Sequence, residues 1–515
     1  MFLINIIGFI LVLGLVIFIH ELGHFIMAKR AGILCHEFAI GMGPIVFSRK
    51  KGETLYSLRA IPIGGFVMMA GEDVTTEMIE EGQEIKVVRN KIGKITEIIL
   101  DAEDERYPDA EKITVESYDL QGKYQAPLLI NDYEVHRRAH FVHKQKRLQV
   151  APFNRSFESK SLGARFSAIV AGPVMNFVLA FILFLLVAFF VGFPVRDSEG
   201  AVIPEVGVVE ENSPAEGRLE AGDELIKVVN IDNGVVDGSW HAFQEMISDN
   251  KGQREFEVLI DRDGEEMFVT LTPRLQINSV GITSTMDPDD DVVVGDVLRD
   301  SPAAQAGVQS GDVILSVGGE EIDDWSDAIA VFDEQLGDDV ALTVLRDGQE
   351  ESLEISPYPR ELIESQIGET ASTYFGIGPV REFAFLDSFR DAGANVAASS
   401  TMIFDTLRML FGGTVQVGQL SGPVGIYAIT TTALQDGILT LVTWVALLSV
   451  NLGILNLLPI PALDGGRILF LAYEGVTRRK PNKTVEQYLT FVMFVLLLGL
   501  ILYVTYTDIL SLLGL

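Results

Sequence analysis

The sequence has little cysteine and little positive charge. Cys35 is the single cysteine in 515 residues, so no internal disulfide can form. Lysine and arginine number 39 against 72 aspartates and glutamates, which gives a formal net charge of −33 at pH 7. Nucleic-acid binding needs a basic surface, so this charge argues against a nucleic-acid partner. The acidic residues are expected to form a solvated, self-repelling surface, with a specific basic partner as the alternative.

A basic leader is also missing before the first apolar stretch, residues 2–28. That stretch is too long for a secretory signal peptide, and its removal would delete a histidine motif, so we expect it to remain as a membrane span. Hydrophobic residues make up 48% of the chain and charged residues 22%. This balance fits apolar spans joined to soluble modules better than a disordered chain or a purely membrane-embedded one.

Four stretches are long and apolar enough to cross a bilayer, namely residues 2–28, 166–193, 438–458 and 488–506. Basic residues cluster after the first stretch, before the second, and between the third and fourth: Lys29, Arg30, Arg49, Lys50, Lys51, Arg155, Lys160, Arg165, Arg478, Arg479, Lys480 and Lys483. The positive-inside rule puts these clusters in the cytoplasm. Both termini and the stretch from about residue 196 to 435 are then expected outside.

The first apolar stretch contains His20-Glu21-Leu22-Gly23-His24. Two imidazoles four residues apart lie on one face of a helix and can reach one zinc ion, while Glu21 can act as a general base. A bare glutamate inside a membrane is costly unless it is paired or functional. The pattern predicts a zinc protease whose active site lies within the membrane. A chance match on an anchor helix is the alternative.

Two histidines leave a zinc ion short of ligands, because a catalytic site takes three protein ligands and keeps one position for water. Glu37 is a possible third ligand, but it follows too closely to return easily to the same helix face. Asp464 is the better candidate, because prolines near it can break a helix and glycines allow close backbone packing. Alternatively, Asp464 only caps the helix that follows it.

Residues 36–71 read as short apolar strands broken by glycines, and we expect them to fold back against the membrane beside the metal. Residues 72–160 are polar and predict a cytoplasmic β-rich insertion. Its histidines, His136, His140 and His143, are interleaved with basic residues, which favours a solvated basic face over a metal cluster.

The expected exterior region contains an internal repeat. Val-Gly, Ser-Pro-Ala and Gly-Asp follow one another over residues 206–223 and again over residues 294–312, and each copy precedes an Asp-Gly hairpin turn. The signature resembles that of bacterial PDZ domains, which bind an extended peptide as an added strand. Val280-Gly281-Ile282 and Phe375-Gly376-Ile377 resemble the peptide-binding strand. A spacer without a ligand is the alternative for both copies.

Taken together, these motifs resemble the site-2 protease family of intramembrane metalloproteases, most closely its bacterial regulator-of-sigma-E branch. The resemblance covers nearly the whole chain and rests on His20 to His24, Pro62-Ile63-Gly64-Gly65, Ala171-Gly172-Pro173 through Asn176, Ser421-Gly422-Pro423, and Asn451 through Gly466. It implies Zn²⁺ as cofactor, with His20, His24 and Asp464 as ligands and Glu21 as catalytic base. It also implies that Asn456, Pro459 and Asn451 bind substrate.

The family resemblance further implies hydrolysis of peptide bonds in the transmembrane segments of single-pass proteins, either anti-sigma factors or remnant signal peptides. It implies a bacterial plasma membrane, contact with membrane lipids, and an upstream site-1-type protease that cuts the same substrates first. The PDZ-like modules would act as a substrate size filter, with the active site near the cytoplasmic side. A metal transporter and a non-catalytic scaffold are less consistent with Glu21 beside the histidines.

We therefore expect a polytopic α-helical membrane protein with four transmembrane helices, a membrane-associated β-hairpin region and two β-rich PDZ-like extracytoplasmic domains. The expected parts are residues 1–35, first transmembrane helix; 36–71, membrane-associated strands; 72–160, cytoplasmic insertion; 161–195, second transmembrane helix; 196–285 and 286–382, PDZ-like domains; 383–435, amphipathic juxtamembrane segment; 436–475, third transmembrane helix with the Leu-Asp-Gly motif; and 476–515, cytoplasmic loop and fourth transmembrane helix.

Overall fold

The computed structural model describes residues 2–72, 78–123, 126–143, 146–231, 234–236, 238–285, 292–298, 301–363, 368–412 and 420–512. The chain divides into two compact units. The first unit contains Met1–Phe184, Asn395–Ser400 and Gly422–Tyr503, and the second contains Leu185–Ala394, Thr401–Ser421 and Val504–Leu515.

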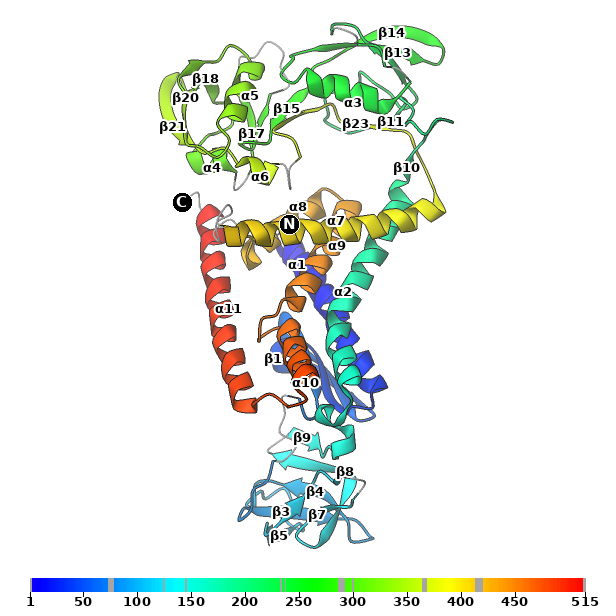
Figure 1. Cartoon of the computed structure of the whole chain (residues 1–515), viewed down its shortest axis with the longest axis vertical. Helices are drawn as coiled ribbons and strands as arrows, with labels where there is room; N and C mark the ends of the chain where they lie inside the picture. Colours follow the sequence, from blue (N-terminus) through cyan, green and yellow to red (C-terminus); the bar gives the residue numbers. More distant parts are fainter. Residues whose placement is uncertain are drawn as a thin grey trace. The chain divides into compact units, whose positions relative to one another are not determined.

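Among the described residues, four helices are long and apolar enough to cross a membrane (Figure 1). They are α1 (Phe2–Arg30), α2 (Leu162–Val191), α9 (Ile438–Leu457) and α11 (Lys483–Leu512). Each is helical because lipid offers no hydrogen-bond partner, so the backbone has to bond within the segment. Two shorter helices, α8 (Pro423–Gln435) and α10 (Asp464–Thr477), belong to the first unit, which also contains α1, α9 and most of α2 and α11. The four spans expected from hydropathy are therefore all helices of suitable length.

Two long strands follow α1 directly. β1 (Cys35–Lys51) pairs with β2 (Thr54–Met69), and Ile40 lies opposite both Gly65 and Leu58 because the strands fold back on themselves. The bends coincide with glycines of positive φ, +83° at Gly41 and +84° at Gly64, where a side chain would be strained. The short strands expected over residues 36–71 are thus segments of two continuous strands. The two strands expose several large apolar side chains, namely Met42, Ile45, Val46, Phe47, Leu58 and Ile61.

The insertion expected over residues 72–160 forms a seven-stranded sheet (Figure 1). Its strands are β3 (Glu84–Arg89), β4 (Ile95–Ile99), β5 (Glu111–Thr114), β6 (Tyr118–Asp119), β7 (Leu128–Ile130), β8 (Tyr133–His143) and β9 (Lys146–Gln149). The order is β5-β3-β4-β8-β7-β6, with β9 paired to β8. His136 and His143 are exposed on β8, and neither belongs to a cluster with metal-ligand geometry among the described residues. The insertion is β-rich, as its composition indicates.

The second unit contains two β-rich modules, each with its own hydrophobic core. The first core is built around Trp240, Phe256 and Phe375, and the second around Ile282, Trp325 and Phe332. The first module includes β11 (Val206–Val209), β12 (Glu224–Val228), α3 (Trp240–Asp249), β13 (Phe256–Arg262), β14 (Glu265–Leu271) and β23 (Ile377–Pro379). The second includes β15 (Arg274–Ile277), β16 (Ile282–Ser284), β17 (Val294–Val297), α4 (Pro302–Ala306), β18 (Val313–Val317), β19 (Glu320–Glu321), α5 (Trp325–Glu334), β20 (Val340–Arg346), β21 (Gln349–Ile355) and β22 (Ala371–Tyr374).

The pairing of these strands corrects the boundary expected between residues 285 and 286. β23 pairs with β11, so the chain completes the first module only after it has built the second. In the same way, Gly376 lies close to Ser213 within the first module, whereas Gly281 lies close to Ser301 within the second. The second module is therefore inserted within the first. A sequence repeat marks where similar turns recur, but it does not reveal which strand closes which sheet.

The recurring Gly-Asp of the repeat has a structural role in both modules. Asp223 accepts hydrogen bonds from Arg262, and Asp312 accepts from Nε and Nη2 of Arg346 at 2.8 and 2.6 Å. Both aspartate side chains are 1% exposed. Burial raises the pKa of Asp312, but the hydrogen bonds from Arg346 and from the backbone of Gln309, together with the charge of Arg346, outweigh burial, so that the pKa is lowered. Each pair thus ties the Gly-Asp turn to the strand before the Asp-Gly hairpin.

Helix α7 (Phe385–Gly412) follows the modules and carries an apolar stripe. Phe189, near the end of α2, packs its ring against Phe383, Phe385 and Phe389. Beside this aromatic cluster, β10 (Phe193–Pro194) pairs with β24 (Arg381–Glu382). The chain therefore leaves α2 and returns to α7 at neighbouring points, with both modules between them in sequence.

Candidate metal centre and active site

Helix α1 and helix α10 bring together three side chains that are far apart in sequence. Nε2 of His20 and Nε2 of His24 lie 3.1 Å apart, because a spacing of four residues places both rings on one face of α1. Oδ2 of Asp464 lies 3.1 Å from Nε2 of His20 and 3.2 Å from Nε2 of His24. Both histidines are 7% exposed. Among the described residues, this is the group with the geometry to hold a metal ion.

The donor atoms of this group fit Zn²⁺. Oδ2 of Asp464 is buried and has no hydrogen-bond partner among the described residues, although two imidazole nitrogens lie close to it. A buried acceptor without a donor is costly, whereas a shared cation would satisfy all three atoms at once. Two imidazole nitrogens and one carboxylate oxygen are a common ligand set for catalytic zinc and leave a fourth position open.

Helix α2 contacts the other nitrogen of each imidazole. Nδ1 of His24 lies 2.8 Å from the carbonyl oxygen of Ala168 and donates its hydrogen there, which leaves the Nε2 lone pair for a metal. Nδ1 of His20 lies 3.2 Å from the amide of Asn176, which is fully buried in α2. Oδ1 of Asn176 has no partner as placed, and rotation of the amide would let it accept Nδ1–H of His20. The backbone oxygen of Asn176 accepts from Ser449 on α9 at 2.8 Å.

Small residues let α1 and α2 approach closely at this point. A Cβ built on Gly23 would lie 2.2 Å from the carbonyl oxygen of Ala171, so any side chain there would separate the helices. A Cβ built on Gly172 would lie 2.3 Å from Nε2 of His24 and 2.9 Å from Cε1 of His20. Small residues at crossing points are typical of helices packed in membranes. The Ala-Gly-Pro motif therefore keeps the space in which the imidazole rings sit.

Asp464 is the first residue of α10, after a segment broken by Pro459 and Pro461. The residue at the N-cap is Leu463, and no side-chain hydrogen bond caps the helix. A Cβ on Gly465 would lie 2.1 Å from the carbonyl oxygen of Leu458, so this turn needs glycine. The Asp464 side chain meets the histidines and does not act as a helix cap, which was the alternative open from the sequence.

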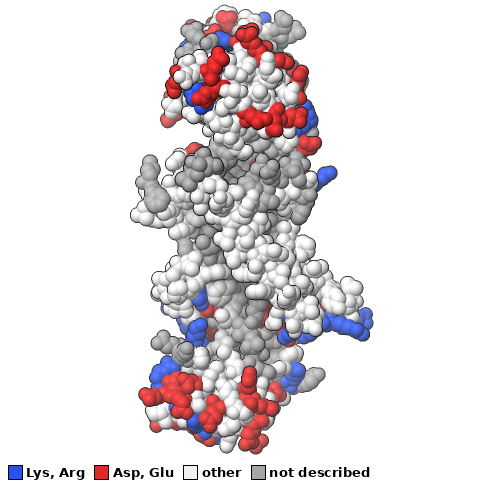
Figure 2. All heavy atoms as spheres, turned by 90° about the vertical axis from the view of Figure 1, so that its left-hand side faces the viewer, with Lys and Arg blue, Asp and Glu red and all other residues white. Residues whose placement is uncertain are grey.

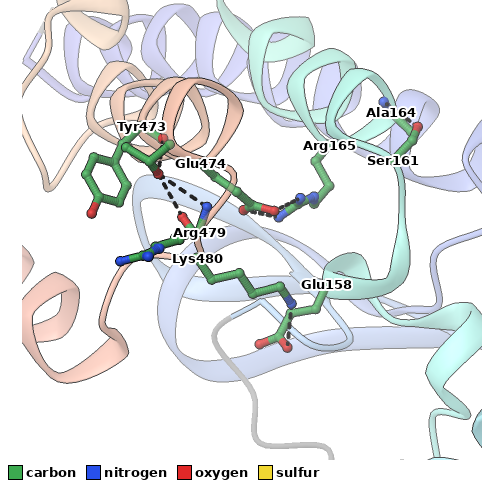
Figure 3. A network of polar contacts seen from close by, with 9 residues as sticks. Glu158, Ser161, Ala164, Arg165, Tyr473, Glu474, Arg479 and Lys480 are labelled. Atoms are coloured by element: carbon green, nitrogen blue, oxygen red, sulfur yellow. Dashed lines mark hydrogen bonds and ion pairs between the residues drawn. The ribbon is translucent and has the colours of Figure 1, made fainter.

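The other end of α10 is fixed by a partly buried ion pair (Figure 3). Arg165 at the start of α2 donates from Nη1 and Nη2 to Oε2 and Oε1 of Glu474, at 2.9 and 2.6 Å. The two side chains are 9% and 15% exposed. Outside this pair, Lys480 lies 3.8 Å from Glu158. A bidentate arginine–carboxylate pair fixes the orientation of the two side chains as well as their distance. The end of α10 that is remote from Asp464 is therefore held against α2.

Glu21 and Glu37 occupy different environments. Glu21 forms no ion pair or hydrogen bond with any described residue, and β2 approaches it so closely that a Cβ on Gly65 would lie 3.0 Å from its Cγ. Glu37 is 7% exposed and accepts from Nη2 of Arg59 at 2.6 Å and from the Ser57 hydroxyl. Glu37, the other possible third ligand, is therefore engaged with Arg59, while Glu21 remains available beside the histidines.

The three residues predicted to bind substrate lie along and beyond the end of α9. Asn451 and Asn456 are partly buried on the helix, and Pro459 is exposed just after it. In the described part of the chain, none of them forms a hydrogen bond with the histidines or Asp464. Sequence reasoning assigned no role to Asn176 or to the pair of Arg165 and Glu474. A polar Asn inside an apolar span was the available signal for the first.

Comparison with known proteins identifies the family of the chain. The family model described as Peptidase family M50 matches residues 8–500. Zinc metalloprotease RasP of Geobacillus kaustophilus (strain HTA426) is 31% identical over 510 residues, covering 98% of this chain and 97% of the relative. Regulator of sigma-W protease RasP of Bacillus subtilis (strain 168) is 31% identical over 519 residues, covering 99% of each chain. The protein is therefore a zinc metalloprotease with apolar membrane helices, and it belongs to peptidase family M50.

Proposed function

We propose that this protease hydrolyses peptide bonds inside the membrane-spanning segments of single-pass proteins. The observation that carries the proposal is the convergence of Nε2 of His20, Nε2 of His24 and Oδ2 of Asp464 within helices long enough to cross a bilayer. In this proposal the three residues hold Zn²⁺, and Glu21 is the catalytic base. The ligands come from α1 and α10, so the fold has to form before the metal is held.

Zn²⁺ in this site supplies Lewis acidity, which polarises the scissile carbonyl and makes water a better nucleophile. Glu21 follows His20 in the chain and has no competing partner among the described residues, so its carboxylate is available to accept the water proton. The protonated Glu21 then donates that proton to the leaving amine. The Ala168 carbonyl and Asn176 orient the imidazoles throughout the reaction.

A helical substrate hides its amides in internal hydrogen bonds, so it has to unwind before hydrolysis. Unwound backbone is tolerated in a membrane only where protein satisfies its polar groups. β2 passes beside Glu21 at Gly65 and can add an extended substrate segment as a strand. On the α9 side, the unwound substrate backbone then contacts Asn456, Pro459 and Asn451. Pro459 is exposed, and both asparagines are partly exposed.

The proposed orientation follows from charge. The basic clusters expected in the cytoplasm place the insertion and the active-site end of α1 on that side of a bacterial plasma membrane, with the termini and both modules outside. The two modules are proposed to be PDZ-like and to exclude substrates with bulky exterior domains. Anti-sigma factors are the substrates best supported, because one similar protein is named a regulator of sigma-W protease. An upstream site-1-type protease would make the first cut.

The test of the catalytic proposal uses the full-length protein reconstituted in lipid with a single-pass substrate. Glu21→Gln removes the base but none of the proposed ligands, so cleavage should fall by about a thousandfold or more while zinc content is kept. Asp464→Ala should lose both cleavage and zinc. Glu245→Gln, an exposed change in α3, is the matched control and should match the wild type. Unchanged cleavage by Glu21→Gln would refute the proposal.

The filter proposal is tested by removing both modules together. Because β10 pairs with β24, a short Gly-Ser turn in place of residues 196–380 joins neighbouring strands without disturbing α2 or α7. A deletion ending near residue 360 would instead leave Phe375 and β23 without their core. The deleted form should cleave substrates that retain their exterior domain. Unchanged preference for precut substrates would contradict the filter and leave the catalytic proposal standing.

A further inference from the structure

A cavity of about 520 Å³ lies in the first unit, apart from the metal centre. Its lining comes from the last turn of α1, from the ends of β1 and β2 and the turn that joins them, and from strands β8 and β9 of the insertion. Its charged and titratable lining residues are Lys29, Lys50, Lys51, Glu53, Arg138 and His140. The volume is within the range of roughly 300–1,000 Å³ that small-molecule sites occupy.

The three lysines of this cavity have no carboxylate partner in the described part of the chain. Among the described residues, no carboxylate lies within ion-pair distance of Lys29, Lys50 or Lys51. Nζ of Lys50 lies 3.3 Å from Nε2 of His140, whose pKa is lowered by burial and by Lys50. Burial and Lys50 thus favour the neutral imidazole, whose Nε2 can accept a hydrogen bond from Lys50. Three ammonium groups thus face the cavity without an anion to balance them.

Glu53 is the acidic residue of the lining, and its charge is already balanced. Its Oε1 accepts from Nη1 of Arg155 at 2.7 Å and from Nε2 of Gln149 at 3.1 Å. The hydrogen bond from Arg155 lowers the pKa of Glu53 to about 2, so the pair is ionised throughout the physiological range. Nε of Arg138 lies 4.0 Å from Oε1 of Glu53, so that Arg138 adds a further cation to the lining. The cavity therefore keeps an excess of positive charge.

The position of the cavity indicates where a matching anion comes from. Lys29 is in the last turn of α1, a helix suited to span the membrane. Ile45, Val46 and Phe47, which shortly precede Lys50 on β1, are 47%, 67% and 64% exposed. Figure 2 shows lysines and arginines where the uncharged surface of the helices meets the charged insertion. Exposed apolar residues beside ammonium groups match a phospholipid, which joins acyl chains to a phosphate.

We propose that this cavity binds the phosphodiester of an anionic glycerophospholipid. The ammonium groups of Lys29, Lys50 and Lys51 contact the phosphate oxygens, and the acyl chains lie along Ile45 to Phe47. Since Arg138 and His140 come from the insertion, the bound lipid joins the insertion to the membrane-associated strands. This site takes no part in the proposed hydrolysis and is independent of it.

The experiment measures lipids retained by the purified full-length protein, using native mass spectrometry after equal exposure to phosphatidylglycerol and phosphatidylcholine. The wild type should retain phosphatidylglycerol in preference, and Lys50→Gln with Lys51→Gln should weaken that retention about tenfold or more. Lys91→Gln with Lys123→Gln removes the same charge from exposed positions of the insertion and should leave retention unchanged. Inorganic phosphate at millimolar concentration should not displace the lipid.

Equal retention of phosphatidylglycerol by the wild type and the Lys50→Gln, Lys51→Gln variant would overturn the proposal. So would displacement by inorganic phosphate, since the site would then recognise the free anion. Arg138→Gln is the second variant, because this side chain is 76% exposed and its loss should not affect folding. It should weaken retention in the same direction by a smaller factor, and unchanged retention would also count against the site.

Discussion

Gly172 of α2 lies against the imidazole of His24, so closely that a Cβ built at residue 172 would be 2.3 Å from Nε2. The absence of a side chain at this position is therefore part of the proposed metal centre. Ala168, one turn earlier on the same helix, accepts the hydrogen of Nδ1 of His24 at 2.8 Å. One face of α2 thus sets both the position and the tautomer of this ring.

Gly172→Ala should displace the imidazoles of His20 and His24 and abolish stable zinc binding, because the methyl group needs the space that they occupy. We expect zinc content to fall to background and cleavage to fall with it, measured on protein purified without added metal. Gly163→Ala is the control, because a Cβ built on Gly163 of the same helix would meet open space. This variant should retain both zinc and cleavage. Full zinc occupancy in Gly172→Ala would contradict the claim that the imidazole rings need the space at Gly172.

Asn176→Ala should weaken zinc affinity by about 10–100-fold, the usual effect of removing a group that orients a metal-bound histidine. Asn176→Asp supplies an acceptor for Nδ1–H of His20 at the same position and should restore most of the affinity. Competition with a zinc chelator provides the measurement. If alanine and aspartate weaken binding equally, Asn176 has only a packing role.

That His20, His24 and Asp464 come together could be predicted from sequence, because their chemistry is local or tied to a motif, and zinc binding by them remains a prediction. His20 and His24 share one helix face, and Asp464 stands in a segment broken by prolines and glycines. The role of Glu21 and those of Asn451, Asn456 and Pro459 remain predictions. Arg165 and Glu474 were not predicted as partners, because Arg165 reads as part of a basic flank and residue 474 fell within the expected third span, so that only the packing of the two helices brings them together.

The module boundary shows a different limit. The repeat correctly marks two similar β-rich modules, yet Phe375 packs in the first core and Ile282 in the second. Strand pairing between distant segments depends on which sheet edge is open, and a repeat carries no information about that. The order of turns in the sequence was therefore predictable, whereas the closure of each sheet was not.

Arg165→Ala should destabilise the first unit by about 1–3 kcal/mol, because it removes two hydrogen bonds to the partly buried carboxylate of Glu474. Reversing the pair with Arg165→Glu and Glu474→Arg should recover part of this loss. Thermal unfolding of the full-length protein in detergent gives the measurement. Lys480→Ala, which removes an exposed contact to Glu158, should change stability by less than about 1 kcal/mol. Equal effects of the two alanine variants would contradict a structural role for the partly buried pair.

The second module should lose stability as the pH falls below about 4, where the Asp312 carboxylate, with its ordinary pKa of 3.8, becomes protonated in the unfolded chain. The folded-state pKa is lower, so the contribution of Asp312 is complete well above 3.8 and disappears as the pH falls through the folded value. Hydrogen exchange of β18 and β20 in the full-length protein at pH 7 and pH 3 provides the readout. Asp312→Asn should reduce this pH dependence, and an unchanged pH profile would contradict the assignment.

The central claim is that His20, His24 and Asp464 together hold one zinc ion, and X-ray absorption at the zinc edge tests it most directly. Measured on full-length Glu21→Gln protein, the spectrum should show two imidazole nitrogens at about 2.0–2.1 Å and carboxylate or water oxygen at about 2.0–2.2 Å. Asp464→Ala should lose the zinc signal. A sulfur shell at about 2.3 Å, or an unaltered spectrum in Asp464→Ala, would contradict the account.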